Sequence, residues 1–135
     1  MSSVFADTSF FVALLVPRDR FYAKATRLMI EITERIVTTD WVLVEMANFM
    51  GRSKSRLRVA SFVRELQADF RLDIVPSTAA AIEAGLSFYE RHDDKEWSLT
   101  DCISFQVMRR ESIQLALTAD HYFEQAGFEI LLNEN

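Results

Sequence analysis

Short apolar runs alternate with longer amphipathic stretches along the chain. The short runs predict strands over Ser3–Ala6, Arg35–Thr38, Leu72–Val75, Gln114–Thr118 and Phe128–Leu132. Segments with helical spacing predict helices over Thr8–Val16, Arg20–Glu34, Asp40–Gly51, Lys54–Phe70, Ser77–Arg91, Ser98–Glu111 and Asp120–Gln125. Strands separated by helices predict an α/β fold, with a central, mainly parallel sheet of four to five strands between two layers of helices.

Residues with special backbone preferences mark the ends of these helices. Pro17 ends the first predicted helix, since proline lacks the N–H that the helix needs. Asp40, Ser77 and Ser98 are predicted N-caps, because their side chains can accept a hydrogen bond from the first turn. Gly127 is the predicted stop after the last helix.

Composition indicates one compact unit over residues 1–135, with 50% hydrophobic residues, three glycines and two prolines. The single cysteine, Cys102, cannot form an internal disulfide, which favours the reducing cytoplasm. The N-terminus lacks the charge pattern of a signal peptide. The longest uncharged apolar stretch, Phe10–Pro17, is too short to span a bilayer. We therefore expect a cytoplasmic protein without a membrane partner.

The net charge of −5 argues against a basic coat that binds nucleic acid over the whole surface. The charge counts less against a nuclease that uses a metal ion, because the ion supplies positive charge where the substrate binds. Aromatic residues exceed what a small core needs, which predicts a self-association or partner surface among Phe10, Phe11, Phe21, Tyr22, Phe49 and Phe62.

Four acidic residues occupy positions from which they can reach one cleft. Asp7 follows the first predicted strand directly, and Asp120 follows the fourth after one alanine. If both strands are central and parallel, both carboxylates lie at the same edge of the sheet. Asp101 lies in the first turn of a helix, and Glu45 is embedded in an apolar run. Carboxylate oxygens are the ligands that Mg²⁺ and Mn²⁺ prefer.

Each acid also has a purely structural interpretation. Asp7 and Asp120 can cap the helices that follow them. Asp101 completes a capping-box pattern with Ser98. Glu45 shares one helical stripe with Asn48 and Arg52, as on a solvated face. These alternatives stay open for each residue taken singly, whereas the conjunction of all four favours a metal site.

The order of these motifs resembles the PIN-domain family of ribonucleases over essentially the whole chain. VFADTSFFVALL (4–15) resembles the opening strand and acid, and WVLVEMAN (41–48) resembles the second motif, with its glutamate on a helix. SLTDCISFQVMRR (98–110) resembles the third motif, and LALTADHYFEQAGFEIL (115–131) resembles the fourth. Within the family, the chain looks most similar to the toxin nucleases of VapBC-type bacterial toxin–antitoxin pairs.

The resemblance implies metal-dependent endonucleolytic cleavage of RNA. In the family, the acids matching Asp7, Glu45, Asp101 and Asp120 bind one or two Mg²⁺ or Mn²⁺ ions. Asp7 and Asp101 are our predicted direct ligands, whereas Glu45 and Asp120 could ligate or orient metal-bound water. The resemblance also implies a homodimer and an antitoxin protein that fills the groove.

Two further sets of residues are candidates for contact with the substrate. Hydroxyls beside the acids could bind water or phosphate, although helix capping and backbone bonding are the favoured explanation for each: Thr8, Ser9, Thr100 and Thr118. A basic cluster at a helix junction could contact RNA phosphates, with a solvated helix end as the alternative: Arg52, Lys54, Arg56 and Arg58.

Other functional classes fit the sequence less well. A HAD-type phosphatase needs a second aspartate where Ser9 stands, and a receiver domain needs a late lysine that the chain lacks. No P-loop pattern occurs. Two alternatives within the family stay open, namely a non-toxin nuclease for RNA processing and a non-catalytic module that binds a protein.

Overall fold

The computed structural model describes residues 2–52 and 54–134 and contains the predicted parallel sheet. The strands are β1 (Ser3–Ala6), β2 (Arg35–Thr39), β3 (Leu72–Val75), β4 (Leu115–Leu117) and β5 (Glu129–Ile130). They lie in the order β3-β2-β1-β4-β5, and every neighbouring pair is parallel. The strand order reverses between β1 and β4, which is where ligands bind in open α/β sheets.

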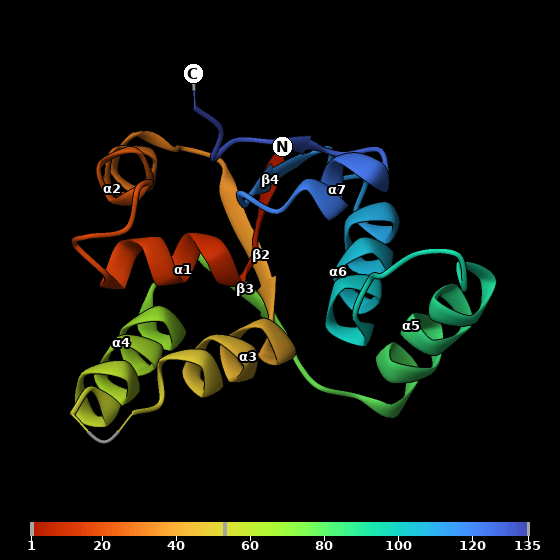
Figure 1. Ribbon diagram of the computed structural model, residues 1–135, viewed down its shortest axis with the longest axis horizontal. Helices are drawn as coiled ribbons and strands as arrows, with labels where there is room; N and C mark the ends of the chain where they lie inside the picture. Colours follow the sequence, from red (N-terminus) through yellow and green to blue (C-terminus); the bar gives the residue numbers. More distant parts are fainter. Residues whose placement is uncertain (1, 53, 135) are drawn as a thin grey trace.

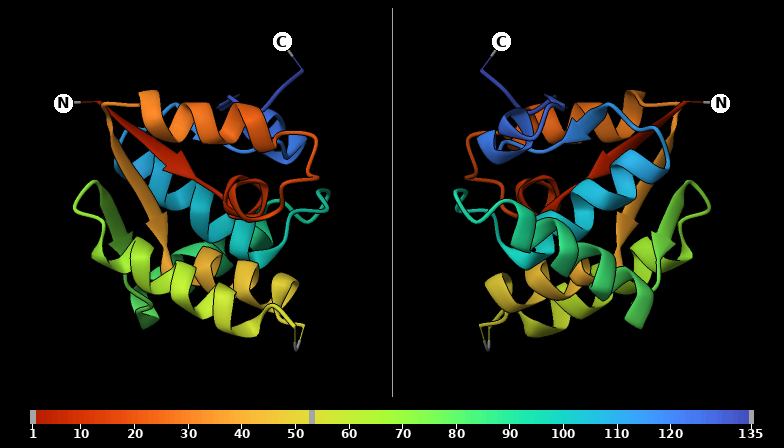
Figure 2. Two further views of the ribbon diagram at one scale, coloured as in Figure 1. Left: turned by 90° about the vertical axis from the view of Figure 1, so that its left-hand side faces the viewer. Right: turned by 90° about the vertical axis from the view of Figure 1, so that its right-hand side faces the viewer.

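Helices cover both faces of the sheet, which confirms the predicted three layers (Figures 1 and 2). The first group is α1 (Thr8–Leu15), α2 (Tyr22–Glu31), α3 (Asp40–Met50) and α4 (Arg56–Ala68). The second group, on the opposite face, is α5 (Ala79–Arg91), α6 (Leu99–Arg110) and α7 (His121–Gln125). No helix in the described part of the chain is long and apolar enough to cross a membrane.

The predicted caps at Asp40 and Ser77 are wrong by one residue. Thr39 caps α3 by accepting a hydrogen bond from the Val42 N–H, and Thr78 caps α5 in the same way. Both threonines have the extended backbone that an N-cap requires. Asp40 instead accepts a hydrogen bond from the Ser77 N–H and so ties α3 to the segment before α5.

The ends of the chain's other elements follow the predictions closely, with some shorter than expected. The predicted cap of α6 at Ser98 is confirmed, and Gly127 follows α7 with a φ of 99°, in the left-handed region that favours glycine. The last strand covers Glu129–Ile130 rather than Phe128–Leu132. Backbone bonds from Leu131 to Ala116 and from Leu132 to Thr118 continue alongside β4, so the neighbouring segments remain paired beyond the regular strand.

Some of the aromatic residues that were predicted to form a partner surface are instead part of the hydrophobic core. Phe10 and Phe11 are fully buried, which removes them from any partner surface, whereas Phe49 keeps 69% of its surface exposed. The first strand is central and its residues Val4, Phe5 and Ala6 are almost completely buried. Burial of β1 on both faces holds the residue that follows it, Asp7, in a fixed position.

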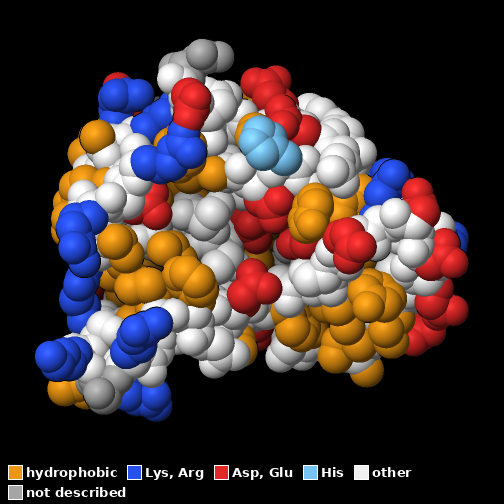
Figure 3. Space-filling view, in the orientation of Figure 1, with side chains coloured by type: hydrophobic (Ala, Val, Ile, Leu, Met, Phe, Trp, Pro, Cys, Tyr) orange, Lys and Arg blue, Asp and Glu red, His pale blue; other side chains and the backbone are white. Residues whose placement is uncertain are grey.

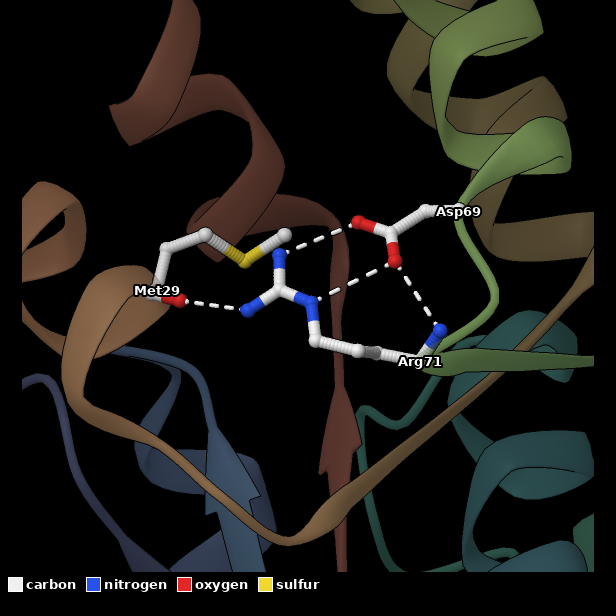
Figure 4. A network of polar contacts seen from close by, with 3 residues as sticks. All are labelled: Met29, Asp69 and Arg71. Atoms are coloured by element: carbon white, nitrogen blue, oxygen red, sulfur yellow. Dashed lines mark hydrogen bonds and ion pairs between the residues drawn. The ribbon is translucent and has the colours of Figure 1, made fainter.

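A network around Arg71 fixes the end of α2 against the turn before β3 (Figure 4). The Arg71 guanidinium donates to the Met29 carbonyl at 2.8 Å and to both carboxylate oxygens of Asp69 at 3.0 and 3.3 Å. The Met29 carbonyl lies in the last turn of α2, where helix carbonyls lack partners within the helix. The Arg71 side chain holds the pKa of Asp69 below its ordinary value by hydrogen bonding to the carboxylate.

Close packing of α5 on α6 depends on a glycine. A Cβ atom at Gly85 would lie 2.4 Å from Cγ1 of Ile103, a residue that is 2% exposed. We expect Gly85→Ala to lower the free energy of unfolding by about 1–3 kcal/mol, because overpacking costs more than the gain in helix propensity. Chemical denaturation measures the change, with Ala84→Ser on the exposed side of α5 as the control. A more stable Gly85→Ala variant would mean that Ile103 adopts another rotamer at little cost.

Candidate active site

The four acids predicted from the sequence all line one cavity of about 330 Å³ at the switch point of the sheet. Asp7 directly follows β1, Asp120 follows β4, Glu45 lies in α3 and Asp101 in the first turn of α6. Figure 3 shows acidic side chains gathered in the hollow at the middle of this face. The structure therefore brings together all four acids that the sequence predicted for one cleft.

Asp7 is the most buried of these acids, with 4% of its surface exposed. It occupies the N-cap position of α1 but makes no side-chain capping bond, so helix capping does not explain it. Its Oδ2 accepts a hydrogen bond from the Thr118 hydroxyl at 3.1 Å, whereas its Oδ1 is buried without a hydrogen-bond partner among the described residues. Burial, together with the nearby carboxylates of Asp101 and Glu45, raises the pKa of Asp7 to about 7.

Asp101 combines a structural role with a position in the cavity. Its Oδ2 accepts a hydrogen bond from the Ser98 N–H at 3.1 Å, and the Ser98 hydroxyl accepts one from the Asp101 N–H at 3.0 Å. The predicted capping box is thus present. Burial, with the charges of Asp120 and Glu45, raises the pKa of Asp101 to about 6. The capping box fixes the carboxylate in place at the cavity wall.

Glu45 and Asp120 are half-buried and are each held by one bond. The Thr8 hydroxyl donates to Glu45 Oε1 at 2.5 Å, which joins α3 to the start of α1. This contact and the position of Glu45 in the cavity wall argue against the solvated stripe that the sequence left open. Asp120 caps α7 by accepting a hydrogen bond from the Tyr122 N–H at 2.8 Å, so its structural interpretation is also correct.

Two hydroxyls connect the ends of β1 and β4. The Ser9 and Thr118 hydroxyl oxygens lie 3.0 Å apart, and Ser9 also accepts a hydrogen bond from the Ala119 N–H at 3.0 Å. Thr118 accepts one from the Asp120 N–H at 3.1 Å while it donates to Asp7. This network orients the Asp7 carboxylate relative to the loop that carries Asp120.

The remaining predicted residues lie outside the cavity wall. Thr100 does not line the cavity, in contrast to Thr8 and Ser9. The basic cluster lies at the junction of α3 and α4, and its four side chains are exposed: Arg52, Lys54, Arg56 and Arg58. Within it, Arg56 donates to the Gly51 carbonyl at 3.1 Å and Arg58 donates to the Leu15 carbonyl.

Three residues of the cavity wall were missing from the predicted site: Val12, Asp19 and Phe49. Asp19 lies between α1 and α2, where it accepts a hydrogen bond from the Phe21 N–H at 2.9 Å. No strand or helix pattern fixes the position of such a loop residue. Phe49 stands four residues after Glu45 in α3, and this helical spacing is the signal that could have found it.

The donor set suits a hard divalent cation. It consists of carboxylate oxygens, and the buried Oδ1 of Asp7 lacks a partner among the described residues. In the part of the chain that the structure describes, no group of three or more His, Cys, Asp or Glu side chains is arranged to hold a metal ion by itself. Mg²⁺ commonly keeps several waters and takes only one or two carboxylates directly, so an open arrangement of this kind fits it.

The structure combines a parallel α/β sheet with a cavity at its switch point whose charged lining residues are all acidic. The PIN-domain pattern matches residues 4–129, and the chain belongs to the PIN-domain family. The chain is similar to the 23S rRNA-specific endonuclease VapC20 of Mycobacterium tuberculosis, with 35% identity over 126 residues, or 93% of this chain and 95% of the relative. The resemblance to toxin-type endoribonucleases that the sequence predicted is thereby confirmed.

Solved structures agree with this assignment. The crystal structure of M. tuberculosis VapC20, described as a sarcin–ricin-loop-cleaving toxin, matches with a TM-score of 0.84 and 30% identity over 93% of this chain and 95% of that one. DNA-bound VapBC from Salmonella typhimurium matches with a TM-score of 0.69 over 97% of this chain and 98% of that one. At 12% identity, the second match shows the shared fold alone.

Proposed function

We propose that this chain is a divalent-metal-dependent endoribonuclease whose reaction centre consists of Asp7, Glu45, Asp101 and Asp120. The main support for this proposal is that the four acids line one cavity. In addition, one oxygen of Asp7 is buried and has no hydrogen-bond partner among the described residues. Burial, together with the neighbouring carboxylates, raises the pKa of both Asp7 and Asp101, and a cation in the cavity would offset this effect by supplying positive charge.

Asp7 and Asp101 are the proposed direct ligands of Mg²⁺ or Mn²⁺, one ion or two. A bound ion of this kind lowers the pKa of its water and stabilises the charge that develops on the scissile phosphate. Thr118 orients Asp7, and Thr8 restrains Glu45 at the cavity wall. Glu45 and Asp120 either bind the ion as well or orient its water molecules.

Ribosomal RNA is the proposed substrate to test first. The relative from M. tuberculosis is a 23S rRNA-specific endonuclease, and its similarity covers 93% of this chain. The same relationship supports a role as the toxin of a toxin–antitoxin pair, with an antitoxin protein as partner. The homodimer implied by the family resemblance stays a prediction, for which size-exclusion chromatography with light scattering is the direct measurement.

Metal dependence is tested by incubating the purified protein with 23S rRNA in Mg²⁺, in Mn²⁺ and in excess EDTA. We expect discrete cleavage with either cation, none in EDTA, and recovery when Mg²⁺ is returned in excess. Mapping the new 5′ ends identifies the cut. Equal cleavage in EDTA would exclude the proposed use of a cation, and absence of cleavage in every RNA tested would favour the binding-only alternative.

A further inference from the structure

An exposed aromatic ring lies at the edge of the acidic cavity. Phe49 lines this cavity together with Glu45, yet 69% of its surface is exposed. It therefore adds little to the core, in contrast to the fully buried Phe10 and Phe11. A large apolar side chain left in water beside a reaction centre is available for contact with a ligand.

Helix α3 leads from the carboxylates past this ring to the basic cluster. Side chains four residues apart in a helix have Cβ atoms about 5–6 Å apart, so the Phe49 ring stands one turn beyond Glu45. The helix ends at Met50, and Arg52 and Lys54 follow in the turn before α4. In Figure 3, hydrophobic surface lies between the acidic hollow and the Lys and Arg side chains towards the lower left.

The order of these groups along α3 and the turn after it, with carboxylates first, then an aromatic ring and then basic side chains, suits the binding of single-stranded RNA. Proteins bind single strands by combining cationic contacts to the phosphates with aromatic rings on which bases stack. We propose that Phe49 stacks on a base next to the scissile phosphate, while Arg52 and Lys54 contact the phosphate backbone beyond it. The proposal rests on the ribonuclease function proposed above and names a residue that determines how the RNA is held.

A nucleic-acid base fits this position better than the apolar core of a protein partner. The ring shares its cavity with the carboxylates of Glu45 and Asp19. An apolar partner surface would have to remove water from these charges, which is costly, and charged residues are depleted at the centres of protein interfaces. A base has a flat face for the ring and polar edges that remain hydrated.

The test compares kcat/KM for cleavage of a short fluorescein-labelled single-stranded RNA containing a site that the wild type cleaves. The variants are Phe49→Ala, Phe49→Leu and Phe49→Trp. Leu57→Ala is the matched control, because Leu57 is 88% exposed and lines a different groove, between α3 and α4. We expect Phe49→Ala and Phe49→Leu to lower kcat/KM by about 5- to 150-fold, the range measured for loss of one stacked base.

Phe49→Trp is expected to retain at least the wild-type value, since tryptophan presents a larger π-face, and Leu57→Ala to leave it unchanged. A series of RNAs with one abasic nucleotide each then locates the stacked base. At one position beside the cut, loss of the base should weaken cleavage by the wild type and leave Phe49→Ala unaffected. Melting curves check that every variant folds.

If the wild type cleaves RNA and Phe49→Ala cleaves it at the same rate, the stacking role is overturned while the ribonuclease function stands. The same holds if no abasic position affects the wild type and the Phe49→Ala variant differently. A Phe49→Leu variant as active as the wild type would also overturn it, since leucine keeps apolar bulk without a π-face. A changed oligomeric state with unchanged cleavage would assign Phe49 to a protein interface instead. If the wild type cleaves no RNA, the proposed function fails first, and the stacking role fails with it.

Discussion

Replacing Asp7 by asparagine is expected to lower RNA cleavage by about 10³-fold or more. A catalytic cation supplies several kcal/mol of stabilisation to the transition state, and each 1.36 kcal/mol corresponds to a factor of ten in rate. The asparagine side chain lacks the charge that retains the cation. Its amide oxygen could still accept the hydrogen bond from Thr118, and α1 loses no side-chain cap, because Asp7 provides none. The loss of rate should therefore occur in a folded protein.

The measurement is kcat/KM for the mapped RNA site in Mg²⁺, together with a thermal melt of each protein. Asp94→Asn is the matched control, because Asp94 is an exposed acid in the loop after α5 and the substitution changes the net charge equally. Its rate should stay within about twofold of the wild type, since exposed charges are strongly screened. Equal cleavage by the Asp7→Asn variant and the wild type would remove Asp7 from the reaction centre.

The fold was predictable because its signals are local. Apolar runs such as Ser3–Ala6 predict buried strands, and alternation with helices predicts a parallel sheet. The positions of Asp7 and Asp120 in the cavity wall were predictable for the same reason, since the carboxyl ends of parallel strands share one edge. The errors at Asp40 and Ser77 arose where two residues that can cap stand side by side, and backbone geometry decides between them.

The rest of the site depends on packing that local patterns do not encode. Glu45 reaches the cavity because α3 packs beside α1, and only the family resemblance indicated this placement in advance. Asp19 lies on a loop, and Phe49 resembles the other apolar residues of α3. The sequence pattern therefore did not assign either residue to the cavity. For Asp101 and Asp120 the structural and chemical interpretations proved compatible, since both cap a helix while lining the cavity.

Stabilisation by Mg²⁺ should grow as the pH rises from 5 to 8. Burial raises the pKa of Asp7 to about 7 and, to a lesser extent, that of Asp101 to about 6. Between about pH 4 and 7 the folded protein without cation therefore retains protons that the unfolded chain has lost. The free energy of unfolding falls with rising pH over this window, by about 4 kcal/mol at most from Asp7. The lowered pKa of Asp69 acts in the opposite direction, but only at more acidic pH.

Mg²⁺ binds the ionised carboxylates and competes with protons, so it restores stability where the metal-free protein is weakest. At a concentration 100 times its dissociation constant, a ligand adds about 2.7 kcal/mol, which corresponds to roughly 10 °C in Tm for a chain of this size. Thermal melts with Mg²⁺ and with EDTA should differ by about this amount at pH 8 and by little at pH 5. The Asp7→Asn variant should show a flatter pH profile and a small response to Mg²⁺ at both pH values. An equal Mg²⁺ effect at pH 5 and pH 8 in the wild type would mean that the ion binds away from these buried acids.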